Sequence, residues 1–330
     1  MSATFTELSI VCVTYESARV IGGWLDGVHS LLPGAQIVVV DNASGDETLR
    51  IVGKRAPDAV VIESGGNVGF ARGCNAGARA ASGPFVMFLN PDARIAAVDP
   101  DLLIRELGQG QTGILVPLMR SDRGSTSYEI FSDRSAAGEW FVHVMGPLWP
   151  RVGPKPPWAI RHGSRWASGA ALIVSAEEFK KLGGFDESFF LLYEDRELSA
   201  RYRAAGYSLR ESRAVTITHD IGTSSSAEGL DVRRRCWAAL SWVELRCATA
   251  GEPAGRTTAK RIRAGLRIQA GIAGGLARLG ASRTLLGRKL CEAGEVEQCM
   301  CEAGGLAEAG FYRRARAAVK PTRAEVSDHG

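Results

Sequence analysis

Two adjacent acidic residues end an apolar run in the second half of the sequence. Five apolar residues occupy positions 189–193, and Glu194 and Asp195 follow them directly. Apolar runs of this length usually lie inside a fold, where a carboxylate costs free energy unless something compensates it. A carboxylate held there can act as a general base, because it can take a proton from a bound hydroxyl group. The simpler alternative is that Asp195 only caps the helix predicted after it.

A second set of polar residues has the chemistry to hold a metal ion and a phosphate group. Asp92 follows an apolar strand in "FLNPDA", residues 88–93, and His219 ends the stretch "AVTITH". A carboxylate can hold a hard cation that keeps room for substrate phosphates, and a histidine can join it. The glycines of "SGGNVGFARGCN", residues 64–75, let the backbone approach a ligand closely, and Arg72 could reach a phosphate. Each stretch is also ordinary turn chemistry, so the structural alternatives stay open.

The first hundred residues predict the sheet that would position these groups. Strands alternate with helices, which favours an α/β fold with a parallel sheet covered by helices on both faces. The predicted strands are residues 8–15, 36–40, 59–64 and 84–95. Polar residues follow each strand, where ligands bind in such sheets. Further on, we predict a strand at 167–175, helices at 176–184 and 196–207, and further strand at 208–220.

Composition narrows the class of protein. The chain has 330 residues, is 45% hydrophobic and 23% charged, and therefore predicts a folded domain with an appendage. It has no run of eighteen apolar residues, and its N-terminus lacks the features of a signal peptide. The seven cysteines form no CxxC pair, so we expect reduced thiols in a cytoplasmic protein.

The charge is unevenly distributed along the chain. Residues 1–252 have a net charge of −3, whereas residues 253–330 have a net charge of +7, which indicates a basic helical extension. From Lys260 the extension predicts an amphipathic helix whose apolar face is formed by Ile262, Leu266, Ala270, Ala273, Leu276 and Ala277. Two interpretations stay open, namely peripheral contact with an anionic membrane and packing on the catalytic domain, and we favour the membrane.

The order of the motifs resembles a known family. The motifs are "SIVCVTY", "VVVDNAS", "GGNVGFARGCN", "FLNPDA", "WASGAALIV", "GGFDESFFLLYEDRELSARYRAAGY" and "THDIGTSS". Their order over roughly residues 8–225 resembles family 2 of the inverting, nucleotide-sugar-dependent glycosyltransferases, especially the rhamnosyltransferase-like branch. The resemblance implies a GT-A-type, Rossmann-like, mostly parallel sheet flanked by helices in residues 1–252. It further implies a nucleotide-binding half at 1–117, an acceptor-binding half at 118–252, and the extension at 253–330.

The resemblance also implies roles for individual residues. Asp195 is the general base, and a divalent cation, Mg²⁺ or Mn²⁺, is held by Asp92 and His219. The acceptor lies against Trp166, Gly169 and Glu194. The donor is bound by Thr14, Tyr15, Asp41, Asn67, Gly69, Arg72, Asn75 and Asn90. The chain departs from the family at two positions, because Asn90 replaces the first acid of an Asp-x-Asp motif and Glu197 replaces the last acid of a Glu-Asp-x-Asp motif.

The implied reaction is transfer of a sugar from a nucleoside diphosphate to an acceptor hydroxyl with inversion. The stretch "MGPLWPRVGP" is similar to bacterial enzymes that add rhamnose to lipid-linked N-acetylglucosamine, so dTDP-rhamnose is the favoured donor and cell-envelope polysaccharide the favoured product. A soluble acceptor with another nucleotide sugar, or a non-catalytic nucleotide-sugar-binding protein, are the alternatives. A nicotinamide oxidoreductase is disfavoured because G-x-G-x-x-G is absent, and no nucleic-acid partner is predicted.

Overall fold

The computed structural model divides the chain into two compact units. It describes residues 4–108, 113–120, 126–128, 130–132, 136–144, 165–219, 230–278 and 295–296. Unit 1 comprises residues 1–131, 164–187 and 194–224, and unit 2 comprises residues 132–163, 188–193 and 225–330. The predicted domain boundary at residue 252 differs from this division, because it falls inside unit 2.

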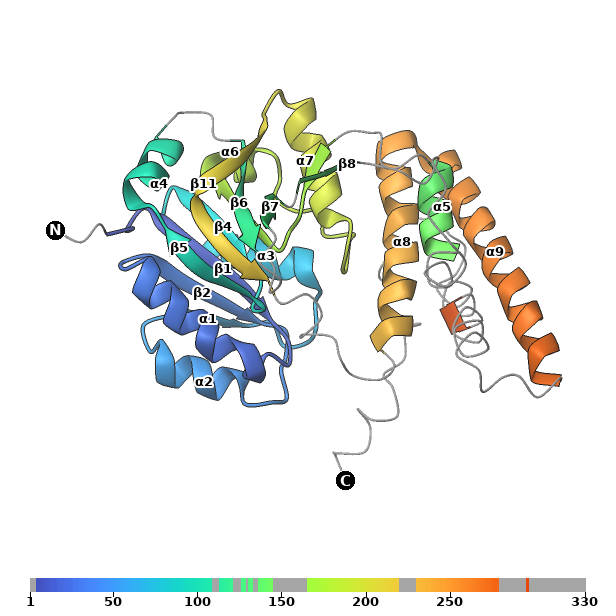
Figure 1. Cartoon of the computed structure of the whole chain (residues 1–330), viewed down its shortest axis with the longest axis horizontal. Coiled ribbons are helices and arrows are strands. Elements are labelled where there is room, and N and C mark those ends of the chain that lie inside the picture. Colours follow the sequence, from blue (N-terminus) through green and yellow to red (C-terminus); the bar gives the residue numbers. More distant parts are fainter. Residues whose placement is uncertain are drawn as a thin grey trace. The chain divides into compact units, whose positions relative to one another are not determined.

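Unit 1 is built on one mixed sheet (Figure 1). Its strand order is β3-β2-β1-β4-β10-β6-β11-β5, with β7 beside β6. The first four of these strands are parallel, whereas β10 runs antiparallel to both of its neighbours and β5 runs antiparallel to β11. The strands are β1 (Leu8–Thr14), β2 (Gln36–Asp41), β3 (Val60–Glu63), β4 (Phe85–Leu89), β5 (Ala93–Val98), β6 (Ile114–Arg120), β7 (Thr126–Tyr128), β10 (Ala171–Ser175) and β11 (Leu209–His219).

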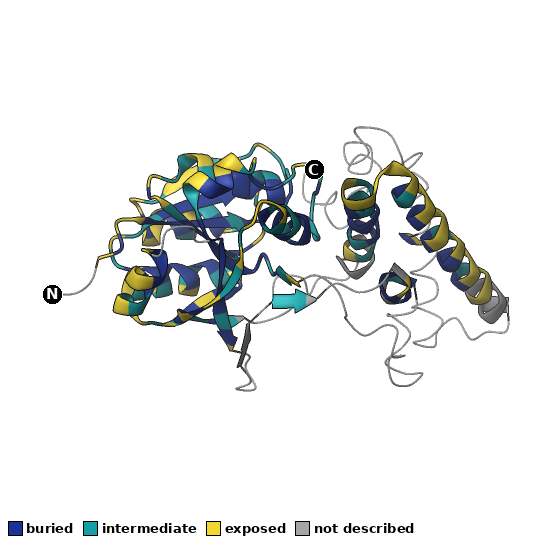
Figure 2. Ribbon diagram, turned by 90° about the horizontal axis from the view of Figure 1, so that it is seen from above, coloured by how far each residue is buried: buried dark blue, intermediate teal, exposed yellow. Residues whose placement is uncertain are grey.

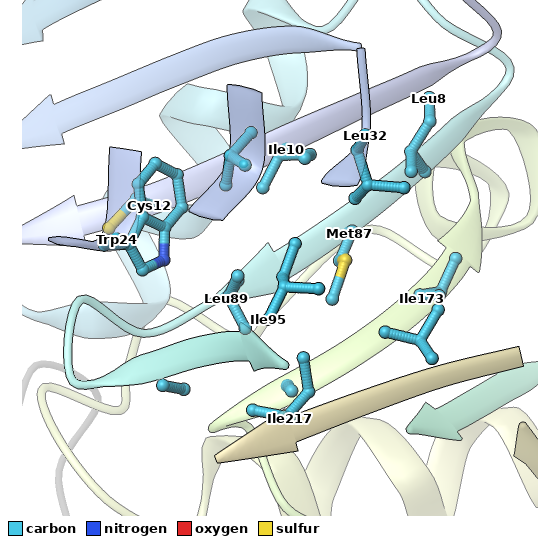
Figure 3. Packing of buried hydrophobic residues seen from close by; sticks show 14 of the residues in the cluster. Leu8, Ile10, Cys12, Trp24, Leu32, Met87, Leu89, Ile95, Ile173 and Ile217 are labelled. Carbon is cyan, nitrogen blue, oxygen red and sulfur yellow. The ribbon is translucent and has the colours of Figure 1, made fainter. Parts of the chain in front are cut away.

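Helices cover both faces of this sheet, as the alternation of strands and helices predicts. They are α1 (Ala18–Leu31), α2 (Thr48–Arg55), α3 (Phe70–Ala80), α4 (Pro100–Leu107), α6 (Ala176–Lys181) and α7 (Glu194–Ala204). Successive side chains of a strand point to opposite faces, so Ile37 and Val39 of β2 join the cluster under α1 and α2. Val38 and Val40 join the cluster under α3 and α7. Figure 3 shows the first cluster, in which Trp24 of α1 packs near Ile10 and Cys12 of β1.

The predicted strand at 84–95 is wrong, because the structure divides it into two. Asn90, Pro91 and Asp92 form a turn that separates β4 from β5. Proline has no N–H group to donate to a strand ladder, which explains a break at this position. β5 then pairs with β11, and this register places His219 opposite Ala93, one residue after Asp92. The break therefore brings the two predicted metal ligands to the same edge of the sheet.

Unit 2 is a group of helices with its own apolar core. It contains α5 (Ala136–Val144), α8 (Leu230–Ala250) and α9 (Glu252–Arg278) (Figure 1). Trp237 and Leu240 of α8 are buried together with Ile262 and Leu266 of α9. Cys236, also on α8, is disulfide-bonded, so the expectation of reduced thiols is wrong for this residue. The remaining thiols that the structure describes, Cys12, Cys74 and Cys247, are free.

The prediction that the apolar stripe of α9 faces a membrane is wrong for Ile262 and Leu266. These residues are 0% and 1% exposed, because they pack against α8 within unit 2. Figure 2 shows the buried and exposed faces of α9 alternating along its length. Ala273 and the residues after it in α9 have no described side chains. Among the described residues, no helix has both the length and the apolar character needed to cross a membrane.

The two-stranded sheet of β8 (Ile130–Ser132) and β9 (Arg165–Ala167) lies apart from the main sheet's strand order. Ser168 follows β9, the turn is formed by Gly169 and Ala170, and β10 starts directly after it at Ala171. The predicted strand at 167–175 is therefore two strands joined by a turn. At this turn the chain meets the acid pair of α7, because the N–H group of Gly169 donates to Asp195.

Glycines set how closely α3 approaches the sheet. A Cβ atom on Gly77 would lie 2.3 Å from Val11, and one on Gly73 would lie 2.8 Å from Val13. Both distances are shorter than any contact that carbon atoms tolerate, so only glycine lets the helix backbone rest on β1 at these positions. Gly73, which the sequence suggested for ligand approach, thus also serves packing.

We predict that Gly77→Ala destabilises the protein and that Gly53→Ala stabilises it. The first substitution overpacks the contact with Val11 and should lower the free energy of unfolding by about 1–3 kcal/mol. Gly53 lies in α2, and a Cβ atom there would have no neighbour within 4 Å, so alanine should add about 0.5–1 kcal/mol through helix propensity. Urea unfolding of both variants measures the difference, and equal effects would contradict the packing explanation.

Candidate functional site

The carboxyl ends of β1 and β2 carry a buried hydrogen-bonded pair. Thr14 donates from its hydroxyl group to Oδ1 of Asp41 over 2.8 Å. Asp41 is 1% exposed, and its two oxygens also accept the hydroxyl and backbone N–H groups of Ser44. A carboxylate has about four acceptor positions, so three are used by the protein. Tyr15, the next residue after Thr14, is exposed at 42% and lies at the same strand end.

The Gly-rich stretch forms a tight entry into α3. Gly69 has φ +89°, a conformation that favours glycine, and it directly precedes the first residue of the helix. Its N–H group donates to the side chain of Asn67, and its carbonyl accepts from the side chain of Asn42. N–H groups in the first turn of a helix lack intrahelical partners, so this entry can receive an anionic group.

Arg72 and Asn75 of α3 contact the loop at 184–187 instead of an open site. Oδ1 of Asn75 accepts the N–H group of Phe185, and its Nδ2 donates to the carbonyl of Phe185 and to Glu187. These bonds occupy the whole amide, so Asn75 holds the loop and has no donor left for a nucleotide. Nε of Arg72 lies 3.5 Å from a carboxylate oxygen of Glu187.

The predicted metal ligands lie at neighbouring strand ends, Asp92 just before β5 and His219 at the end of β11. Asp92 is 7% exposed in the turn after β4, and its charge raises the pKa of the buried Cys12 thiol, after burial itself. The strand register places His219 beside Ala93, although the side chain of His219 is not described. Among the described residues there is no cluster of three potential metal ligands. One carboxylate suits a hard cation that takes its other ligands from a substrate diphosphate, so the donor set fits Mg²⁺ or Mn²⁺.

The acid pair opens α7, and its two members face different surroundings. Oδ2 of Asp195 accepts the backbone N–H of Gly169 over 2.9 Å, and Oδ1 accepts the N–H of Arg196 over 2.8 Å. Burial raises the pKa of Asp195 to about 6, although these two hydrogen bonds and the charge of Arg196 lower it. Glu194 is 4% exposed, and its Oε2 has no hydrogen-bond partner among the described atoms. Burial, followed by the charge of Asp195, raises the pKa of Glu194 well above its ordinary value.

Gly169 lies between the first residue of α3 and the acid pair. A Cβ atom on Gly169 would lie 3.3 Å from Phe70, the first residue of α3, and 3.5 Å from the Cβ atom of Asp195. The pKa of Cys74 on α3 is raised by burial and then by the charge of Glu194 and by Cys12. These contacts place the start of α7, the start of α3 and the end of β1 in one neighbourhood.

A side chain of α7 accepts a hydrogen bond from the backbone of β9. Oγ of Ser199 accepts the N–H of Ala167 over 3.1 Å, one helical turn beyond the bond from Gly169 to Asp195. Asp195 is thus inside the helix and bonded across to another segment, which separates it from the simple capping alternative. Glu197, whose role the sequence left open, binds Arg201 through both of its carboxylate oxygens.

Trp166 lies between two partners beside the acid pair. Its ring centroid is 4.9 Å from that of Phe131, at a tilt of 43°. The guanidinium carbon of Arg196 lies 5.5 Å from the centroid of the Trp166 ring. The sequence indicated Trp166 as an acceptor contact, but the involvement of Arg196 has no sequence signal beyond its position after Asp195.

The apolar run before the acid pair belongs to unit 2. Phe190 stacks on Trp237 with centroids 4.3 Å apart, and the hydroxyl of Tyr193 bonds Glu139 and His143 of α5. Leu192 and Tyr193 both have φ +70°, which is unusual and strained for residues with side chains. Chain positions 190–193 are therefore held by unit 2 immediately before the chain enters α7.

Known proteins resemble this chain in sequence and in structure. Residues 9–149 match the family described as Glycosyl transferase family 2. An N-acetylglucosaminyl-diphospho-decaprenol L-rhamnosyltransferase of Mycobacterium tuberculosis is 27% identical over 223 residues, covering 61% of this chain and 71% of that protein. The low-salt glycan biosynthesis hexosyltransferase Agl10 of Haloferax volcanii is 29% identical over 228 residues, covering 65% and 67%. A solved mannosyltransferase, PcManGT from Pyrobaculum calidifontis, in complex with GDP-Man and Mn²⁺, aligns with a TM-score of 0.48 at 18% identity, covering 88% and 86%.

The family match and the two sequence relatives support a nucleotide-sugar glycosyltransferase. The matched residues 9–149 contain the ends of β1, β2 and β4 and the entry to α3. The match agrees with the family inferred from the order of the motifs, and the predicted α/β fold with helices on both faces of the sheet is confirmed.

We predict that Glu194→Gln raises the free energy of unfolding more at pH 7.5 than at pH 4. With a raised pKa in the fold, Glu194 binds its proton more tightly in the folded than in the unfolded state. The wild-type protein therefore loses stability as pH rises from the unfolded pKa toward the folded one, whereas glutamine titrates in neither state. Urea unfolding at both pH values measures this difference, and a difference independent of pH would show that Glu194 is not the cause.

Proposed function

We propose that the protein is an inverting glycosyltransferase in which Asp195 is the general base. The observation that carries the proposal is the partly buried Asp195 carboxylate, held by the N–H group of Gly169 at the start of α7. A raised pKa of about 6 keeps it ionised at neutral pH yet makes it a better proton acceptor than an exposed aspartate.

The proposed reaction needs one proton acceptor and a stabilised leaving group. The acceptor hydroxyl attacks the anomeric carbon of the donor sugar, its proton passes to Asp195, and the bond to the nucleoside diphosphate breaks. Because a single base supports attack from the side opposite the leaving group, the anomeric configuration inverts. Asp92 and His219 would hold a divalent cation, which would supply positive charge to the leaving diphosphate.

The donor would lie along the ends of β1, β2 and β4. Thr14 and Asp41 shape the end of the sheet, and exposed Tyr15 is available to the base of the nucleotide. Asn67 and Gly69 form the entry to α3, and Asn90 precedes the metal-binding aspartate. Arg72 contacts Glu187 through Nε, and its guanidinium group has further donors for the diphosphate, whereas we assign Asn75 a role in holding the loop at 184–187.

The relatives support a more specific donor and acceptor. One is named for transferring L-rhamnose to N-acetylglucosaminyl-diphospho-decaprenol, and another is a hexosyltransferase of glycan biosynthesis. We therefore propose L-rhamnose, from dTDP-L-rhamnose, as the transferred sugar, and a lipid-linked N-acetylglucosamine of cell-envelope synthesis as the acceptor. The alternative within the same class is a soluble glycan or natural-product acceptor with another nucleotide sugar.

Asp195→Asn should reduce transfer by roughly 10²–10⁴-fold, because the amide cannot take the acceptor's proton. Donor affinity should stay close to that of the wild type, since Asp195 contacts Gly169 and not the strand ends that bind the donor. Release of dTDP from dTDP-L-rhamnose, with and without acceptor, measures turnover, and calorimetry measures donor binding.

Asp101→Asn is a suitable control for Asp195→Asn, because Asp101 is an exposed acid in the first turn of α4. Wild-type turnover in Asp195→Asn would remove Asp195 as the base. A wild-type protein that binds the donor but never releases dTDP would instead favour the non-catalytic alternative.

Asp92→Asn should weaken the stabilisation of the protein by dTDP together with Mn²⁺. A bound ligand raises the melting temperature more when it binds more tightly, and the amide has lost the charge that holds the cation. Thermal shifts with dTDP alone, Mn²⁺ alone and both together measure the linkage without requiring turnover. Asp58→Asn, an exposed acid before β3, is the control. Equal shifts in wild type and Asp92→Asn would exclude Asp92 as a ligand.

A further inference from the structure

Arg196 is a buried cation that directly follows the proposed base in the sequence. It is 8% exposed, and its backbone N–H group donates to Oδ1 of Asp195. Arginine is rarely buried unless its charge is compensated, because removing a guanidinium group from water is costly. The position of this side chain therefore requires a partner that tolerates a cation in a partly apolar setting.

The indole ring of Trp166 is such a partner. The guanidinium carbon of Arg196 lies 5.5 Å from the ring centroid, within the range of a cation–π contact. The ring is itself held by Phe131, and β9, which carries it, is fixed to α7 through Ala167 and Ser199. The same helix thus carries both Asp195 and Arg196. Arg196 contacts Trp166 of β9, and Asp195 contacts Gly169 just after this strand.

The charges around Asp195 come from three elements. Glu194 on α7 faces Cys74 on α3, and burial raises the pKa of both groups. On β9, Arg165 pairs with Glu211 over 3.5 Å. On α3, Arg72 pairs with Glu187. The charge of Arg196 is the one that opposes the effect of burial on Asp195.

We propose that Arg196 is a positioning residue for the general base: its guanidinium group, held on the face of Trp166, keeps the carboxylate of Asp195 ionised and oriented toward the acceptor. This inference rests on the proposed role of Asp195 as the base. It assigns to Trp166 a second task besides any contact with acceptor, which is to fix the distance between a cation and the base. Arg196 itself need not touch either substrate.

The test is the pH dependence of kcat/KM for release of dTDP from dTDP-L-rhamnose by the full chain with Mn²⁺. In the wild type, activity should fall as pH falls through about 6, where Asp195 becomes protonated. Arg196→Met keeps the length of the stem but removes the charge, so the midpoint of this acid limb should move upward by roughly one pH unit. Activity at pH 5.5 should then fall about tenfold more than activity at pH 8.5.

Three further variants separate this role from a structural one. Arg196→Lys keeps the charge and should return the midpoint toward the wild-type value, whereas Trp166→Leu keeps Arg196 but frees it, and should shift the midpoint in the same direction as Arg196→Met. Arg203→Met is the matched control, because Arg203 on the same helix also contacts β9, through the carbonyl of Arg165, but lies about 10 Å further along the helix axis. Its midpoint should match the wild type, since charges that far apart are largely screened.

An unchanged acid limb in Arg196→Met, or an equal shift in Arg203→Met, would overturn the proposal. If Arg196→Met does not fold, as judged by circular dichroism, Arg196→Gln replaces it with the same expected shift. Asp195→Asn separates the role of Arg196 from the role of the base. A wild-type acid limb in Asp195→Asn would refute the base itself, whereas loss of activity there with an unmoved limb in Arg196→Met would refute only the role of Arg196.

Discussion

The hydrogen bond from the N–H group of Gly169 to Asp195 is the contact on which the site depends. It fixes a carboxylate at a place where burial alone would favour its neutral form. A Cβ atom on residue 169 would lie 3.3 Å from Phe70, which is tighter than most such contacts, and 3.5 Å from the Cβ atom of Asp195, which is an ordinary contact. The glycine thus lets two helices from opposite parts of the sequence approach one turn, and one of them brings the acid with it. The remaining contacts of α7, to β9 and to Trp166, keep this approach in register.

The sheet explains why the other polar groups lie where they do. The parallel order β3-β2-β1-β4 gathers the ends of four strands at one edge, and the reversed strand β10 joins them from the second half of the chain. β1, β2 and β4 are covered on both faces, so their polar residues can face solvent only at their ends. Thr14, Asp41 and Asp92 all occupy such ends. The chemistry is therefore concentrated at one edge by the same burial that stabilises the sheet.

Part of this arrangement was predictable from the sequence, and the rest was not, for identifiable reasons. Periodicity and strand-end polarity indicated the α/β class, and the order of the motifs indicated the family. Periodicity could not divide residues 84–95, because Ala93 and Ile95 continue the apolar pattern across the turn at Pro91. Periodicity also could not show that the side-chain amide of Asn75 hydrogen-bonds the backbone of Phe185, since that contact joins residues 110 positions apart. For the apolar run at 189–193, the sequence indicated burial but not which core receives it.

The contact between Asn75 and Phe185 also affects the order in which the chain folds. Forming it closes a loop of about a hundred residues, and the entropy of closing such a loop is lost before the bond can compensate it. The parallel strands β1 to β4 and their helices involve much shorter separations, so they can assemble while the second half is still unfolded. During synthesis, residues 1–117 also leave the ribosome first. This order of folding would leave the newly made chain with the strand ends of β1, β2 and β4 in place before the proposed base, Asp195, joins them, and docking of the loop at 184–187 on α3 would be a late step.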